Sequence, residues 1–120
     1  MLEYKKIICN IVYYNRHKIE YSIGAFNLVD KYLNGNIAHE IYYLNGNRHR
    51  ENAPADIFYY ENGLPHMEFY HLNGEYHRED GPAYILYNKN GEIENEVYWL
   101  NEVIYSKEEY YKQIKLNLYW

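Results

Sequence analysis

Hydrophobic and polar residues alternate along much of this chain in short runs, a pattern that predicts β-strands with two different faces. Three runs, over 40–44, 68–72 and 96–100, share one pattern. Each run places a glutamate, a tyrosine and a leucine on one face. The opposite face of the same strands carries Ile41, Tyr43, Phe69, His71, Val97 and Trp99. A further alternating run, Tyr4–Tyr14, predicts a longer strand near the N-terminus.

Turn motifs recur between these runs at a fixed spacing. Five of the seven glycines follow an asparagine. Asn-Gly between strand-like runs is the strongest local signal of a β-hairpin, because both residues tolerate the positive φ of a type I′ turn. Two series of turns, each with a period of 28 residues, lie at 44–46, 72–74 and 100–102 and at 34–35, 62–63 and 90–91. The segment His49–Ala55 also returns as His77–Ala83, so the chain is built from repeats.

The repeat predicts a single, mainly β domain over 1–120: an antiparallel β-hairpin repeat meander with a short C-terminal capping helix. Ser106 and Glu109 form a capping box at the start of that helix. Tyr110 and Ile114 fall on one helical face, with Leu118 as a candidate third member, and this face would cover the end of the array. The predicted segments are an N-terminal strand over 1–13, a degenerate repeat over 14–41, repeats over 42–69 and 70–97, a partial repeat over 98–105 and the helix over 106–117.

Composition narrows the class of protein. The net charge of −5 argues against direct nucleic-acid binding, which needs clustered basic residues to contact phosphates. The apolar runs are too short for a membrane span or a signal peptide. Cys9 is the single cysteine and cannot form an internal disulfide, so the sequence does not indicate an oxidising compartment. We therefore expect a soluble cytoplasmic protein.

The repeat motif resembles a known family. The series Tyr-x-Leu-Asn-Gly-x-x-His-Arg-x-(Asp/Asn)-x-Pro-Ala, followed by a second Asn-Gly turn, resembles the MORN-like β-hairpin repeats of many phage and giant-virus proteins. It is also similar to bacterial antitoxin-like proteins of the MORN-variant group. The resemblance covers about residues 32–112 and is strongest over Tyr42–Leu100, whereas Tyr21–Phe26 departs from the His-Arg-x-Asp-Gly-Pro pattern. It implies the hairpin repeat fold and a viral protein that acts in the host cytoplasm.

The His-Arg pair at 49–50 and its counterpart at 77–80 contain residue types that bind metals or transfer protons. Because both repeats carry them, we interpret them as residues that each repeat needs in order to fold. In a hairpin with a two-residue loop, Tyr42 lies opposite His49, and the same pairing recurs one repeat later. The motifs of P-loops, thiol redox sites, serine hydrolases and zinc proteases are missing from the sequence. We therefore expect no catalytic residue, no metal and no cofactor.

The surface aromatic residues are the better candidate for a binding site. A single-layer sheet cannot bury both faces, so some of the 18 tyrosines stay exposed or are covered by a partner. Tyrosine and tryptophan dominate the energetically important residues of protein interfaces. The glutamate column adds an acidic stripe, which is a candidate cation site or phosphate mimic as well as an ordinary solvated face. The candidate binding residues are Tyr42, Tyr43, Tyr59, Tyr70, His71, Tyr98, Trp99, Glu40, Glu68 and Glu96.

These features favour a non-catalytic protein-binding repeat module that occludes the surface of a protein partner. The family resemblance implies a sharper version, a phage or virus-type inhibitor of a host defence complex in the manner of an anti-CRISPR protein. The alternative is a small-ligand binding protein whose Tyr, His and Arg columns hold a nucleotide or a sugar. An antitoxin-like protein or a metal-dependent hydrolase is the third interpretation. A homodimer through an open edge or an uncovered face is compatible with all of them.

Overall fold

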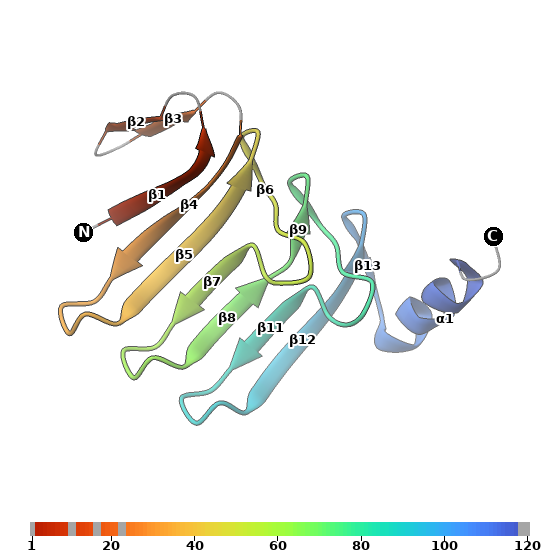
Figure 1. Cartoon of the computed structure of the whole chain (residues 1–120). Coiled ribbons are helices and arrows are strands. Elements are labelled where there is room, and N and C mark those ends of the chain that lie inside the picture. The colour runs from red at the N-terminus through yellow and green to blue at the C-terminus, as the bar shows by residue number, and fades with distance from the viewer. Residues whose placement is uncertain (1, 10–11, 16–17, 22–23, 118–120) are drawn as a thin grey trace.

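The computed structural model is an antiparallel sheet with one helix at its C-terminal end (Figure 1). It describes residues 2–9, 12–15, 18–21 and 24–117, and the side chains of residues 24, 25 and 27–117. The elements formed by the described residues are β1 (Leu2–Cys9), β2 (Val12–Asn15), β3 (Lys18–Tyr21), β4 (Gly24–Lys31), β5 (Ile37–Leu44), β6 (Asn47–Arg48), β7 (Asp56–Tyr59), β8 (Pro65–Phe69), β9 (His71–Leu72), β10 (Glu75–Tyr76), β11 (Tyr84–Tyr87), β12 (Ile93–Leu100), β13 (Val103–Tyr105) and α1 (Lys107–Asn117).

The strand order confirms the predicted fold class. The main sheet runs β1-β4-β5-β7-β8-β11-β12-β13, with β6 beside β5, and its strands pair in an antiparallel manner. The pairs β9–β10 and β2–β3 are separate two-stranded sheets. Figure 1 shows the long hairpins lying side by side like steps, with a second row of short hairpins along one end. The fold is therefore mainly β, a hairpin meander closed by a single helix.

The short hairpins β5–β6, β9–β10 and β12–β13 have the predicted type I′ turns. Two successive residues at each tip have positive φ: 49° and 86° at Asn45 and Gly46, and nearly the same values one unit later. The third tip has a glutamate where the others have glycine, and Glu102 still adopts a φ of 68°. Its carboxylate accepts a hydrogen bond from the Tyr76 amide at 2.6 Å, which offsets part of the cost of the left-handed backbone.

The long hairpins β4–β5, β7–β8 and β11–β12 turn differently, so the type I′ prediction is wrong for their Asn-Gly pairs. Only the glycine has positive φ, for example 91° at Gly63, and its amide donates to the Tyr60 carbonyl at 3.0 Å. This geometry is a type I turn followed by a glycine bulge. The asparagine serves another purpose: Asn62 accepts a hydrogen bond from the Leu64 amide and donates one to the Lys89 carbonyl of the next hairpin.

The N-terminal alternation is divided between two strands instead of the single strand predicted over Tyr4–Tyr14. β1 pairs with β4, whereas β2 pairs with β3 in a separate hairpin. Period-two alternation indicates extended backbone, but it does not show where the chain leaves one sheet for another. Residues 10–11, between the two strands, lie outside the described part of the chain.

The strand register sorts the side chains onto two faces. Paired residues of β5, β7, β8, β11 and β12 form one row with the members Ile41, Asp56, Phe69, Tyr84 and Val97. We call this side the aromatic face, and it also holds Tyr43, His71, Tyr76, Trp99 and Ile104. The next row lies on the opposite side and alternates glutamate with isoleucine. We call this side the glutamate face, and it holds Glu40, Tyr42, Tyr59, Glu68, Tyr70, Tyr87, Glu96 and Tyr98.

The C-terminal helix caps the array as predicted. The Ser106 hydroxyl accepts a hydrogen bond from the Glu109 amide at 3.2 Å, which satisfies one of the unpaired donors of the first helical turn. Tyr110 is fully buried and forms a cluster with two residues of β12, and Ile114 packs against the same cluster. Leu118, the candidate third member of this helical face, lies outside the described residues. The helix thus covers the last unit of the repeat.

Candidate functional site

The tyrosines and glutamates of the glutamate face bind one another. The Tyr59 hydroxyl donates a hydrogen bond to Glu40, and one unit later Tyr87 donates to Glu68 at 2.7 Å. Burial, reinforced by these bonds to a carboxylate, raises the pKa of Tyr59 and Tyr87 well above the usual tyrosine value. Glu40 and Glu68 therefore accept hydrogen bonds within the sheet. They do not form the free acidic stripe that was one interpretation of these residues.

The histidines of the repeat join neighbouring units. The Nδ1 atoms of His49 and His77 accept hydrogen bonds from the amides of Asn73 and Asn101, each at 2.9 Å. The His49 amide donates to the Tyr42 carbonyl, so the predicted cross-strand pairing is present. Among the described residues, no three His, Cys, Asp or Glu side chains come together as a metal site. Both histidines therefore link neighbouring units through hydrogen bonds.

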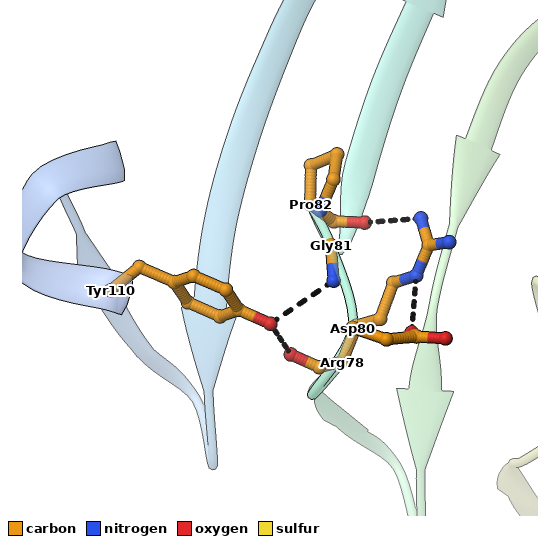
Figure 2. Close-up of polar contacts among 5 residues, drawn as sticks. All are labelled: Arg78, Asp80, Gly81, Pro82 and Tyr110. Atoms are coloured by element: carbon orange, nitrogen blue, oxygen red, sulfur yellow. Dashed lines mark hydrogen bonds and ion pairs between the residues drawn. The ribbon is translucent and has the colours of Figure 1, made fainter. Parts of the chain in front are cut away.

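The arginines that follow these histidines stack on tyrosines of their own units. The Arg50 Cζ lies 3.9 Å from the ring centroid of Tyr42, and the Arg78 Cζ lies 4.0 Å from that of Tyr70. Arg78 also donates to the Pro82 carbonyl at 3.0 Å and forms an ion pair with an aspartate two residues later (Figure 2). Each arginine therefore fastens the proline loop of its unit to the sheet.

The aromatic face contains an apolar groove. Its volume is about 370 Å³, and it is lined by Phe69, Tyr76, Tyr84, Val97, Trp99 and Ile104. The rings contact one another along the groove, with centroid distances of 4.9 Å for both Phe69–Tyr84 and Tyr76–Trp99. The Ile104 side chain at one end is 59% exposed. The lining carries no ionised side chain, so the groove can bind an apolar group without leaving a charge unpaired.

The groove includes repeat positions whose residue types differ between units. Tyr76 and Tyr84 stand 28 residues after Arg48 and Asp56, which form an ion pair at 3.2 Å. One unit therefore has a salt bridge on this face, and the next unit has two aromatic rings in the same places. A contact that every unit needs to fold would be the same in both. The aromatic pair is therefore not a contact that the units share.

The structure separates the candidate residues of the sequence into two groups that cannot form one site. Only Tyr43, His71 and Trp99 lie on the aromatic face, and Trp99 alone lines the groove. His71 and Tyr98 are each 5% exposed, so they offer almost no surface to a partner. Burial lowers the pKa of His71, whose ring centroid lies 4.5 Å from that of the groove residue Tyr76. The other candidates are the tyrosines and glutamates of the glutamate face, namely Tyr42, Tyr59, Tyr70, Tyr98, Glu40, Glu68 and Glu96.

Five groove residues were not among the candidates, namely Phe69, Tyr76, Tyr84, Val97 and Ile104. Tyr76 and Ile104 occupy one repeat position, and Tyr84 occupies another. A signal for them was present in the sequence, because these positions break the chemical pattern of the repeat. The clearest alternation lies in the runs 40–44, 68–72 and 96–100, which contain Trp99 but not Tyr76, Tyr84 or Ile104.

No protein-family model, no curated protein and no solved structure matches this chain, so the resemblance to MORN-like repeats rests on the repeat motif alone. No helix among the described residues is both long enough and apolar enough to cross a membrane. The fold and the groove together define a β-hairpin repeat protein with an uncharged aromatic groove.

Proposed function

We propose that this chain is a non-catalytic protein-binding module whose aromatic face docks on a protein partner. The observation that carries the proposal is the uncharged groove on that face, with Trp99 and three further aromatic rings in its lining. Large rigid rings of this kind supply most of the binding free energy in protein interfaces. The partner is expected to present an apolar ridge, such as one side of a helix, that enters the groove and covers Ile104.

The distribution of charge supports a partner with an apolar contact surface. The groove lining is free of charge, whereas Glu40 and Glu68 lie on the opposite face. Near the groove, the charges of Arg48 and Asp56 neutralise each other in an ion pair. A strongly charged partner would therefore find no complementary group in the groove, whereas an apolar one would bury it without an electrostatic penalty.

The proposal includes a biological setting. The resemblance of the repeat motif to the MORN-like repeats of phage proteins supports a viral inhibitor that covers a working surface of a host defence complex, as anti-CRISPR proteins do. Occlusion needs no catalytic group. It needs a rigid surface, and the hydrogen bonds between successive units of the sheet supply one.

A pair of variants on β13 tests the docking face. Ile104→Glu places a charge at the end of the groove. Val103→Glu places the same charge on the preceding residue, which faces the opposite side of the sheet. The two side chains are similarly exposed, at 59% and 51%, so both variants are expected to fold. Wild-type and variant chains serve as bait in a host-cell lysate, and the purified chains are analysed by size-exclusion chromatography with light scattering.

The proposal predicts a stoichiometric partner that binds the wild type and Val103→Glu but is lost from Ile104→Glu. Equal capture by all three chains would contradict it, because binding would then not use the groove. A purified wild type that dimerises, and an Ile104→Glu variant that is monomeric, would assign the groove to a second copy and also overturn the proposal.

A further inference from the structure

A slot lies between the proline loop of the 70–97 repeat and the last, partial unit, and Tyr110 fills it. The Tyr110 hydroxyl accepts a hydrogen bond from the Gly81 amide at 3.2 Å and donates one to the Arg78 carbonyl (Figure 2). Its ring packs on Tyr98, with ring centroids 4.8 Å apart, and Leu100 belongs to the same buried cluster. The slot is thus built for a phenol: an apolar wall for the ring and two backbone groups for the hydroxyl.

One unit earlier, the counterpart of this slot is an open pocket of about 270 Å³. Its lining includes Arg50, Tyr70 and Leu72, which stand 28 residues before three residues that contact Tyr110. The counterparts of the two backbone groups that bind the hydroxyl are the Ala53 amide and the Arg50 carbonyl. Neither makes a hydrogen bond within the described part of the chain. The pocket therefore has a lining similar to that of the slot, although the Arg78 guanidinium lies over the Tyr70 ring and Asn52 has a positive φ of 62° that its counterpart Asp80 does not share.

Arg78 is one of the lining residues that differ between the slot and the pocket. The last unit has Ser106 where the unit before it has Arg78, and the Tyr98 ring there packs on Tyr110. In the open pocket, the Arg78 guanidinium lies over the Tyr70 ring. An incoming ring would meet this guanidinium, and guanidinium planes stack well on aromatic rings.

The charges around the open pocket favour a neutral ligand. Two arginines line it, but so do Glu79 and Asp80, and Arg78 is already paired with Asp80 at 2.9 Å. The formal charges of the lining therefore balance. A phosphate or carboxylate ligand would meet two carboxylates, whereas a phenol hydroxyl needs only the two backbone partners.

We propose that this pocket, between the proline loops of successive units, binds the side chain of a tyrosine presented by a partner protein. Its hydroxyl would lie between the Ala53 amide and the Arg50 carbonyl, and its ring would stack on the Arg78 guanidinium, which already covers the Tyr70 ring. The inference rests on the proposed function for the protein nature of the partner. It uses a different surface, because Tyr70 lies on the glutamate face and the groove lies on the aromatic face.

Nuclear magnetic resonance of the full-length, ¹⁵N-labelled chain tests the proposal with para-cresol, which has the same ring and hydroxyl as tyrosine. The largest shift is expected at the Ala53 amide. Toluene, which lacks the hydroxyl, is expected to bind about fivefold more weakly because it cannot make the hydrogen bonds. Tyr110→Ala provides a positive control: it empties the last slot, so para-cresol should then also shift the Gly81 amide.

Three results would overturn the proposal. The first is equal binding of toluene and para-cresol. The second is a shift at Gly81 in Tyr110→Ala without one at Ala53. The third is loss of para-cresol binding in Ile104→Glu, because the probe would then occupy the groove. If Tyr110→Ala does not fold, the wild-type titration still decides, since the open pocket is present there.

The source of the tyrosine is tested with two further probes. N-acetyltyrosinamide represents a tyrosine within a polypeptide, and free tyrosine carries an additional ammonium and carboxylate. Binding of N-acetyltyrosinamide at least as tight as that of free tyrosine supports a protein partner, whereas a preference for free tyrosine contradicts it. Because Ile104→Glu is expected to retain this pocket, failure of groove docking and failure of tyrosine binding are separate results.

Discussion

Removal of one hydroxyl from the helical cap should measurably destabilise the protein. Tyr110→Phe keeps the buried ring and its packing on the last strand but removes the oxygen that binds two backbone groups. The Gly81 amide loses its acceptor and the Arg78 carbonyl loses its donor. Tyr110 is 0% exposed and Gly81 is buried, so water cannot easily replace the hydroxyl at the amide. Arg78 is only partly buried, so its carbonyl is expected to recover a water partner.

The magnitude follows from these two environments. A buried polar group that loses its hydrogen bond costs about 1–3 kcal/mol, and a group that water can reach costs less. We therefore expect Tyr110→Phe to lower the free energy of unfolding by about 2 kcal/mol, mostly through the Gly81 amide. Tyr110→Ala also removes the ring and leaves a cavity, which raises the expected loss to about 3–5 kcal/mol.

Urea denaturation followed by far-ultraviolet circular dichroism measures this difference. Tyr105→Phe is the matched control, because Tyr105 packs against the same cluster and its hydroxyl makes no hydrogen bond with the described residues. The control is expected to stay within about 0.5 kcal/mol of the wild type. If Tyr110→Phe also stays within that range, the hydroxyl bridge does not stabilise the cap, and the open pocket is then not expected to bind a phenol.

Two other predictions concern the glutamate face and the histidines. Burial and the neighbouring Glu96 raise the pKa of Tyr98 to about 12, and the pKa of Tyr59 is also raised. Below about pH 10, the usual tyrosine pKa, both residues are protonated in the folded and the unfolded chain, and their contribution to stability is fully present. The contribution is lost as the pH rises from there towards the raised pKa values of the folded state. Thermal melts should show a falling melting temperature above about pH 10, and a constant one would refute the reasoning. His77→Ala removes the acceptor of the Asn101 amide, so urea denaturation should show a loss of about 1 kcal/mol in the free energy of unfolding. Capture of the partner should be unchanged. Lost capture by a folded variant would contradict a purely structural role of His77.

The repeat determined what could be predicted of the fold. The 28-residue spacing of the Asn-Gly turns placed the hairpins and the antiparallel sheet, and the Ser106 capping box placed the helix, because both are local signals. The type of turn at each Asn-Gly pair could not be predicted from the sequence in the same way. Whether the asparagine at a tip adopts positive φ depends on whether its side chain binds the next hairpin, as Asn62 does. That contact is not local in sequence.

The candidate site was predicted only in part, for a physical reason. Alternation showed which residues share a face, and Trp99 was identified in this way. It did not show that the Tyr59 hydroxyl reaches Glu40 on a neighbouring strand or that α1 buries Tyr98. Exposure in a thin sheet depends on such contacts between units. The groove was missed because it lies at positions where the units differ.

The bonds between units have a consequence for how such a chain can change in length. Tyr32 donates to the carbonyl of Tyr59, and Tyr60 donates to the carbonyl of Tyr87 in the same way. The same hydrogen bond thus joins two successive pairs of hairpins. Duplication or loss of one whole unit in the gene would preserve these tyrosine hydrogen bonds at the new junction. Recombination could therefore lengthen or shorten the array in single steps, and each added unit would bring a new set of aromatic-face positions on which selection could act.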